Sequence, residues 1–243
     1  VASFERTVNG LDALGCIEDN GLIEEYGREV ARQFRELGVH VNFAPDADVN
    51  TNPLNPVIHV RSFGENPQRV AEKVVAYSRG LESGGILSVC KHFPGHGDTD
   101  VDSHKALPAL HYDRARLDSV ELLPFKRYIY DGYAGVMTGH LYVPALDKAR
   151  NKPVSMSRAV VTDLLQKELG FRGLCFTDAL AMKGATTRKS DNPSVMALLA
   201  GNDILLAPAA PINDFAAVKE ALEEGILDRE EIEAKIIKIL QYK

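Results

Sequence analysis

Short apolar runs alternate with amphipathic stretches along most of this chain. Each run has turn-forming or polar residues nearby, which is typical of a strand that is covered on both faces. Repeated strand–helix units predict a parallel sheet with helices outside it, so the fold is expected to be α/β. The expected strands are residues 39–44, 86–90, 134–138, 173–177 and 203–207.

The stretches between these runs have the periodicity of helices. Residues 23–37 place apolar side chains three and four positions apart, and Gly38 follows as a stop signal. Pro67 opens a second helix over residues 67–81, and Asp228 is typical of a cap before a helix that contains Ile232 to Leu240. Further helices are expected over residues 115–129, 157–169 and 194–200.

The number of strand–helix units leaves two architectures open, a (β/α)8 barrel and an open doubly wound sheet. Five units are visible in 243 residues, whereas a barrel of eight usually needs about 250 residues. Residues 1–15 have an irregular pattern. Because no linker or short-period repeat is visible, residues 1–243 are expected to form a single domain.

The composition argues against several classes of function. Lys and Arg number 28 against 34 Asp and Glu, a net charge of −6, which disfavours a nucleic-acid partner held by phosphate contacts. No stretch approaches the roughly 20 apolar residues of a membrane span. Cys16, Cys90 and Cys175 lack metal-ligand spacing, and the last two lie in apolar runs typical of buried free thiols. Cellular compartment and oligomeric state stay open.

Polar residues gather just after four of the expected strands. Asp48 follows the first, the stretch from Lys91 to His104 follows the second, His140 the third and Asp178 the fourth. In a parallel α/β fold the carboxyl ends of all strands point to one face, where ligands bind. We therefore expect Asp48, His92, His140 and Asp178 on one face of the fold.

The stretch from Lys91 to His104 has four interpretations. A metal site is disfavoured because Pro94 and Gly95 oppose the helix that would place His92 and His96 on one face. A phosphate-binding loop lacks the third glycine and the following helix of the dinucleotide fingerprint. A solvated polar loop and a mobile catalytic loop with glycine hinges are the other two.

A catalytic interpretation of this stretch needs a proton donor. Asp102 lies two positions before His104 and can orient its imidazole and raise its pKa, which makes a donor that works near neutral pH. Asp178, at the end of an apolar strand, is a candidate nucleophile, general base or metal ligand, or else a helix cap. A carboxylate opposite a proton donor is the pair that retaining glycoside hydrolysis uses.

Four motifs resemble, in the same order, those of family 3 glycoside hydrolases. The resemblance is to the β-N-acetylglucosaminidase (β-hexosaminidase) branch, which uses an Asp-His pair as acid/base, and it runs from about Glu24 to the C-terminus. The motifs are Asn42-Phe-Ala-Pro45 with Asp48-Val49, Arg61-Ser-Phe-Gly64, Lys91-His-Phe-Pro-Gly-His-Gly-Asp-Thr99 followed by Asp102-Ser-His104, and Phe176-Thr-Asp-Ala-Leu180 with Met182.

The resemblance implies a TIM-type (β/α)8 barrel and retaining cleavage of terminal β-linked N-acetylglucosamine through a covalent glycosyl-aspartate. Asp178 resembles the nucleophile, His104 the acid/base and Asp102 its partner. The expected substrate-binding residues are Arg61, Lys91, His92, Asp48 and His140.

The same resemblance implies cis peptide bonds at Lys91–His92 and Phe93–Pro94. No metal or other cofactor is expected. The family normally carries, before the matched region, a strand with a sugar-binding Asp and Arg, and this strand is missing before Val1. The barrel is therefore expected to be incomplete at its N-terminus, as a fragment without the further domains of longer relatives.

The leading hypothesis is an exo-acting β-N-acetylhexosaminidase that acts on cell-wall fragments or chitin-like sugars, with a small N-acetylglucosamine-containing glycoside as its partner. A glycoside phosphorylase is the main alternative, because a histidine acid/base does not repel an incoming phosphate dianion. Another β-glycosidase, such as a β-glucosidase, is also open. A sugar-binding module is disfavoured because Asp178, Asp102 and His104 are all present. A metal-dependent barrel hydrolase is the remaining alternative.

Overall fold

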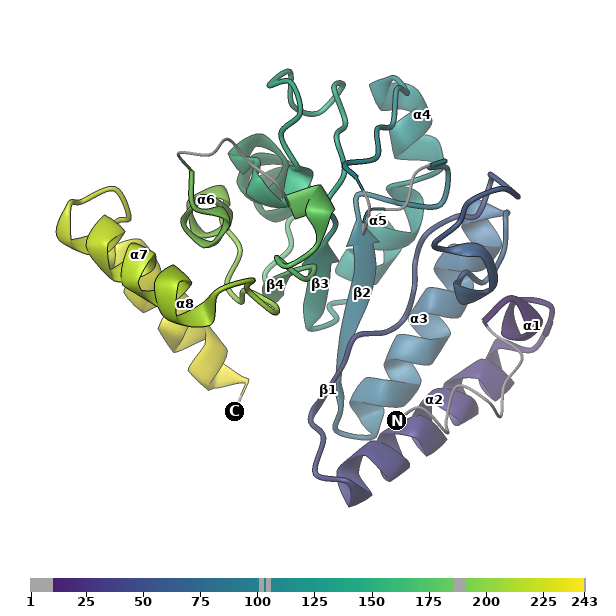
Figure 1. Cartoon of the computed structure of the whole chain (residues 1–243). Helices are drawn as coiled ribbons and strands as arrows, with labels where there is room; N and C mark the ends of the chain where they lie inside the picture. The colour runs from purple at the N-terminus through teal and green to yellow at the C-terminus, as the bar shows by residue number, and fades with distance from the viewer. Residues whose placement is uncertain (1–10, 101–102, 104–105, 186–190, 243) are drawn as a thin grey trace. The chain divides into compact units, whose positions relative to one another are not determined.

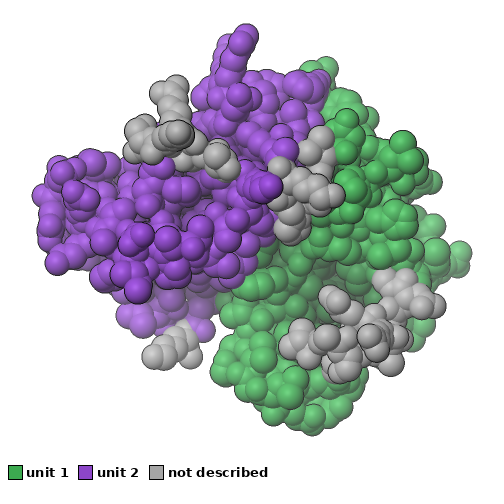
Figure 2. All heavy atoms as spheres, viewed as in Figure 1, with its two compact units in different colours: residues 1–102, 112–137 green, residues 103–111, 138–243 purple. Residues whose placement is uncertain are grey.

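The chain divides into two compact units. The structure is a computed structural model that describes residues 11–100, 103, 106–185 and 191–242. Unit 1 comprises residues 1–102 and 112–137, and unit 2 comprises residues 103–111 and 138–243. Figure 2 shows the two units in different colours. The expectation of a single domain over residues 1–243 stays a prediction.

Unit 1 alternates helices with strands, as the sequence predicts (Figure 1). Strand β1 (Val41–Asn42) pairs in parallel with β2 (Leu87–Phe93), and β2 is next to β3 (Gly135–Thr138) in the sheet. The helices are α1 (Leu11–Gly15), α2 (Asn20–Glu36), the short η1 (His59–Arg61), α3 (Pro67–Ser83), α4 (Arg114–Ser119) and α5 (Leu123–Tyr130).

Helix α3 packs against both α2 and α5. Its crossing with α2 depends on two glycines. A Cβ atom on Gly27 of α2 would lie 2.5 Å from the carbonyl oxygen of Tyr77, and one on Gly80 of α3 would lie 2.2 Å from the carbonyl oxygen of Glu24. The two backbones can approach this closely only because neither position carries a side chain.

The helix expected over residues 115–129 is two helices, α4 and α5. Asp113 caps α4, and its side chain accepts a hydrogen bond from the backbone N–H of Arg116 at 2.8 Å. Pro124 lies in the first turn of α5, where proline is tolerated, whereas in the interior of a longer helix it would break the hydrogen-bond ladder. The proline therefore explains the break. Helix α1 lies in the stretch that the sequence marks as irregular.

Unit 2 contains strand β4 (Leu174–Thr177) and a set of helices. The stretch expected as a helix over residues 157–169 is a π-helix, η3 (Ala159–Glu168), and a helix not anticipated from the sequence follows residue 210. The unanticipated helix is α7 (Pro211–Glu223), and the other helices of this unit are η2 (Val154–Met156), η4 (Lys183–Ala185), α6 (Pro193–Ala200) and α8 (Arg229–Gln241).

The fifth expected strand, residues 203–207, is reduced to one parallel bridge between Ile204 and Phe176 of β4. Beyond Ile204 the chain pairs with irregular backbone. The backbone N–H of Leu206 donates to the Thr177 hydroxyl at 3.0 Å, and its carbonyl accepts from the N–H of Leu180 at 2.9 Å. These local bonds replace a regular strand ladder.

Helix α8 is anchored next to β4 by a buried carboxylate. Asp203 accepts a hydrogen bond from the backbone N–H of Cys175 at 2.8 Å and one from the ammonium of Lys238 at 2.7 Å. Asp228 caps α8 by accepting from the N–H of Glu231 at 3.0 Å, as the sequence predicts. Cys90 and Cys175 are buried free thiols, as predicted, and Cys16 is exposed. Within the described ranges, every helix is too short or too polar to cross a bilayer.

Candidate active site

A buried carboxylate organises the polar cluster of unit 1. Asp48 follows β1, and its Oδ2 lies 2.7 Å from Nδ1 of His92 at the end of β2. The other oxygen, Oδ1, accepts hydrogen bonds from the backbone N–H groups of His92 at 3.2 Å and His96 at 2.6 Å. One side chain thus fixes both the imidazole of His92 and the start of the loop that follows it.

Arg61 and Lys91 belong to the same cluster. Arg61 ends η1, and its Nη2 lies 3.5 Å from Nε2 of His92 and 3.8 Å from Oδ2 of Asp46. Lys91 pairs with Asp46 in a parallel bridge, and its carbonyl accepts from the N–H of Ala47. The structure therefore brings four of the predicted substrate-binding residues together in unit 1: Asp48, Arg61, Lys91 and His92.

The peptide bonds Lys91–His92 and Phe93–Pro94 are both cis, which confirms the expectation from the family resemblance. A third cis bond, Ala44–Pro45, was not expected.

The loop after His92 requires its glycines. A Cβ atom on Gly97 would lie 1.9 Å from the carbonyl oxygen of Val49. Gly95 has a φ of +132°, which side-chain-bearing residues rarely adopt, and its Cβ would lie 2.8 Å from Cβ of Glu121. Asn55 holds the loop from the other side by donating to the carbonyl of His96 at 2.8 Å. The Gly-His-Gly spacing therefore serves close backbone packing.

Burial dominates the electrostatics of the two neighbouring carboxylates. It raises the pKa of Asp46, and the negative charge of Asp48 raises it further, although His92, Arg61 and Lys91 act in the opposite direction. Burial likewise raises the pKa of Asp48. Oδ2 of Asp46 is buried and has no hydrogen-bond partner among the described residues. Asp46 was not selected from the sequence, although it lies two positions from Asp48.

Among the residues that the structure describes, Asp46, Asp48 and His92 have the only three donor atoms within 4.8 Å of one another that suit a metal ion. His92 and Asp48 already hydrogen-bond to each other at 2.7 Å, and the guanidinium of Arg61 lies 3.8 Å from Asp46. Two of the three donor side chains therefore already contact each other, and the third lies near a cation. The expected absence of a metal stays a prediction.

In unit 2, Asp178 follows the last residue of β4 and is partly exposed. Its backbone N–H donates to the carbonyl of Thr138 at 2.9 Å, and its Oδ1 accepts from the N–H of Ala179 at 2.8 Å. The carboxylate therefore lies at the carboxyl end of a buried strand, the position that the sequence predicts for the nucleophile.

His140 is fully buried in unit 2, and both ring nitrogens lie within hydrogen-bond distance of protein atoms. Nδ1 is 2.8 Å from the Ser155 hydroxyl, and Nε2 is 3.1 Å from the carbonyl oxygen of Ala179. Burial lowers the pKa of His140, although the charge of Asp178 acts to raise it. Ser155 carries no motif in the sequence, so pattern analysis alone could not have identified it.

The predicted acid/base pair, Asp102 and His104, lies outside the described residues. The residue between them, Ser103, is buried in unit 2, and its carbonyl accepts from the N–H of Gly184 at 2.9 Å. A Cβ atom on Gly184 would lie 2.8 Å from that carbonyl oxygen and 3.1 Å from Cβ of His140. Ser103 therefore packs closely with the segment after β4. The expected common face for Asp48, His92, His140 and Asp178 spans both units and stays a prediction.

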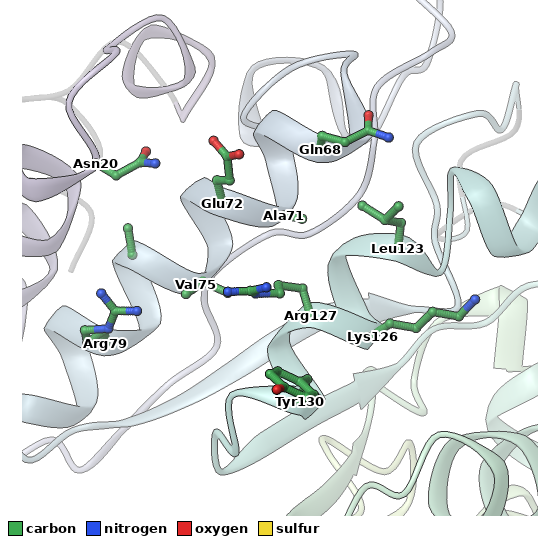
Figure 3. Close-up of a pocket in the computed structure, with 11 residues that line it drawn as sticks. Asn20, Gln68, Ala71, Glu72, Val75, Arg79, Leu123, Lys126, Arg127 and Tyr130 are labelled. Carbon is green, nitrogen blue, oxygen red and sulfur yellow. The ribbon is translucent and has the colours of Figure 1, made fainter.

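A pocket of about 790 Å³ lies between α3 and α5 in unit 1 (Figure 3). Charged side chains at its wall include Glu72, Arg79, Lys126 and Arg127. None of the predicted site residues is among the described residues that line it, so it is separate from the cluster around His92.

Polar side chains that follow parallel strands, in a fold that alternates strands with helices, are typical of α/β-barrel enzymes. The sequence model of the family described as "Glycosyl hydrolase family 3 N terminal domain" matches residues 9–242 of this chain. The chain belongs to glycosyl hydrolase family 3.

Known relatives agree with this family and with the predicted branch. Beta-hexosaminidase A from Pseudoalteromonas piscicida is 39% identical over 234 residues, which cover 88% of this chain and 39% of that protein. The structure of a family 3 beta-N-acetylglucosaminidase from Paenibacillus sp. str. FPU-7 matches with a TM-score of 0.90 and 38% identity, covering 95% of this chain and 44% of that one.

A beta-glucoside phosphorylase matches equally well in fold, with a TM-score of 0.92 and 26% identity over 97% of this chain and 44% of that one. The chain thus spans between 39% and 44% of the length of these three relatives. The matches and the parallel strands are consistent with the predicted fold class, an incomplete (β/α)8 barrel.

Proposed function

We propose that this chain provides the sugar-binding and catalytic residues of a retaining exo-β-N-acetylhexosaminidase. The observation that carries the proposal is the position of Asp178, a partly exposed carboxylate at the carboxyl end of β4 with its backbone tied to Thr138. Family 3 relatives named beta-hexosaminidase and beta-N-acetylglucosaminidase are 39% and 38% identical to it over the aligned residues.

In this proposal Asp178 attacks the anomeric carbon of a terminal β-linked N-acetylglucosamine. His104 donates its proton to the glycosidic oxygen as the bond to the leaving group breaks, and a covalent glycosyl-aspartate forms. His104 then removes a proton from water, which attacks the same carbon and releases the sugar and the carboxylate. Asp102 orients His104. The position of Ser103, which packs beside Gly184 in the same unit as Asp178, supports this assignment.

The sugar is held by the unit 1 cluster. Arg61 and Lys91 supply cationic donors, and the imidazole of His92 is oriented by its hydrogen bond to Asp48. Donors held in fixed positions by buried partners bind hydroxyl groups with little loss of side-chain entropy. We assign Asp48 to the support of His92, because both of its oxygens accept hydrogen bonds from the protein.

The test measures hydrolysis of a panel of nitrophenyl β-glycosides by the wild-type protein and by Asp178→Asn. We expect turnover of the N-acetylglucosaminide above the glucoside and galactoside, and loss of turnover in Asp178→Asn with the fold intact. Asp163→Asn, at an exposed ion pair on η3, is the matched control. Wild-type rates in Asp178→Asn would exclude the nucleophile role. Preference for the glucoside would instead indicate a β-glucosidase.

A glycoside phosphorylase is the second candidate, favoured by the match to a beta-glucoside phosphorylase at a TM-score of 0.92. In that reaction a phosphate oxygen, instead of water, attacks the glycosyl-aspartate and yields a sugar 1-phosphate. The two reactions are distinguished by product analysis with and without phosphate. We expect free N-acetylglucosamine in both conditions. A sugar 1-phosphate as the main product would favour the phosphorylase.

A further inference from the structure

A series of buried hydrogen bonds begins at the backbone of Asp178. Its N–H donates to the carbonyl of Thr138 at 2.9 Å, and the Thr138 hydroxyl lies 2.8 Å from Oδ1 of Asn202. Nδ2 of Asn202 donates to the carbonyls of Ser155 at 2.7 Å and Ala197 at 2.8 Å. Because carbonyl oxygens only accept, the amide nitrogen must face them, and Oδ1 is the atom that faces Thr138.

The series closes on the other side of Asp178. Nδ1 of His140 lies 2.8 Å from the Ser155 hydroxyl, and Nε2 of His140 lies 3.1 Å from the carbonyl oxygen of Ala179. The N–H of Ala179 donates to Oδ1 of Asp178 at 2.8 Å. A closed ring of hydrogen bonds therefore begins at the Asp178 N–H and ends at the Asp178 carboxylate. It passes in order through Thr138, Asn202, Ser155, His140 and the backbone of Ala179.

The geometry fixes the tautomer of His140. The carbonyl of Ala179 can only accept, so the proton must be on Nε2, and Nδ1 of the uncharged ring then accepts from Ser155. Burial lowers the pKa of His140 despite the nearby charge of Asp178, which agrees with an uncharged ring. The four ring members Thr138, His140, Ser155 and Asn202 are all fully buried.

We propose that His140 is a positioning residue, whose Nε2–H tautomer, required by the Ala179 carbonyl and supported by the Ser155 hydroxyl, helps to hold the Ala179 peptide so that the Asp178 carboxylate keeps the direction required for attack. The proposal rests on the nucleophile role given to Asp178 above. A carboxylate bound to the N–H of Ala179 turns with that residue, and the carbonyl of Ala179 is held by Nε2 of His140 at 3.1 Å and by the N–H of Met182 at 3.0 Å. Small changes in the direction of a reacting group can cost large factors in rate.

The kinetic test uses variants that differ by one hydroxyl. Ser155→Val and Ser155→Thr have side chains of nearly equal shape, and only threonine can donate to His140. We expect kcat of Ser155→Val to fall about tenfold below that of Ser155→Thr, with KM within about twofold, because the sugar-binding cluster is untouched. His140→Gln should lower kcat in the same way, and thermal unfolding checks that each variant is folded.

The outcomes separate this proposal from the proposed function. If Asp178→Asn is inactive while Ser155→Val and His140→Gln keep wild-type kcat, His140 does not position the nucleophile. If Asp178→Asn keeps wild-type activity, the nucleophile role itself is wrong and the positioning role falls with it. If Ser155→Thr and Ser155→Val lower kcat by the same factor and also lower the unfolding temperature by the same amount, the role of Ser155 is purely structural and the proposal is overturned.

A second measurement needs no activity. Nitrogen NMR of the protein with labelled histidine reports the protonation of each ring nitrogen, and His140→Gln identifies the signals of His140. We expect an Nε2–H tautomer that persists well below the ordinary histidine pKa of about 6.5. Ser155→Val should weaken this preference, because only the Ala179 carbonyl then favours it, whereas Ser155→Thr should keep it at the wild-type level. A Nδ1–H tautomer or a charged ring near neutral pH in the wild-type protein would overturn the proposal.

Discussion

Nδ1 of His92 lies 2.7 Å from Oδ2 of Asp48, a carboxylate that is fully buried. The two residues are 44 positions apart, and the same carboxylate also accepts from the N–H of His96 at 2.6 Å. Hydrogen bonds to an ionised carboxylate are about twice as strong as neutral ones. The contact therefore orients an imidazole of the proposed sugar-binding cluster and also holds the loop after β2.

Asp48→Asn should weaken both functions of this carboxylate. The amide keeps the shape but lacks the charge, and it places a second donor next to the imidazole. We expect the free energy of unfolding to fall by about 1–3 kcal/mol and KM for the sugar substrate to rise. Urea unfolding and steady-state kinetics measure these effects, with the exposed Asp163→Asn as control. An unchanged urea midpoint would contradict the role of Asp48.

Arg61→Lys should reduce substrate affinity while it preserves charge. The guanidinium of Arg61 lies close to both His92 and Asp46, and a lysine cannot reproduce its planar set of donors. We expect KM to rise about tenfold, equivalent to about 1.4 kcal/mol, with a smaller change in kcat. Arg229→Lys at an exposed position of α8 should leave both constants unchanged. Equal losses at the two positions would argue against a role for Arg61 in binding.

The stability of the protein should depend on the titration of Asp46. Burial raises its pKa above the ordinary value of 3.8, so the folded state binds this proton more tightly than the unfolded state does. The stability contributed by the protonated group is present at low pH and is lost as pH rises above that ordinary value. We expect the unfolding temperature of wild type, relative to Asp46→Asn, to fall from about pH 4 toward neutral pH. A constant difference across that range would contradict the raised pKa.

Treatment with a chelator should leave hydrolysis unchanged. The three donor atoms within 4.8 Å of one another belong to side chains that already contact one another or Arg61. Dialysis against a chelator, followed by assay with and without added divalent cations, tests this expectation. Loss of activity that a divalent cation restores would favour the metal-dependent alternative.

The sequence pattern identified four strands and most helices, because buried parallel strands and amphipathic helices have distinct periods. It could not separate α4 from α5, since the apolar spacing continues through the break and only Pro124 marks it. It could not distinguish the π-helix over Ala159–Glu168 from an α-helix, because both present an apolar face. Residues 203–207 look like a strand, but beyond Ile204 their hydrogen bonds go to irregular backbone and a side chain.

In the candidate site, too, residues in short motifs could be predicted from the sequence, whereas their distant hydrogen-bond partners could not. Arg61, Lys91, His92 and Asp178 lie in motifs, so the resemblance of these motifs to those of family 3 glycoside hydrolases pointed to them. The partners that orient them are dispersed. Ser155 and Asn202 are ordinary buried polar residues in the sequence, and only the folded backbone places them in the ring beneath Asp178.

The crossing of α2 and α3 has a consequence for how the protein tolerates change. Neither Gly27 nor Gly80 can carry a side chain, because an added Cβ would meet the backbone of the other helix. The distance to the nearest carbonyl oxygen would be 2.5 Å at Gly27 and 2.2 Å at Gly80. A second substitution elsewhere cannot relieve such a clash, because backbone atoms cannot be trimmed. The two helices therefore share one permitted alignment, and sliding by a single turn would place ordinary side chains where only hydrogen atoms fit. Although more than fifty residues separate them in the sequence, the two glycines together fix the alignment in which α2 and α3 can pack.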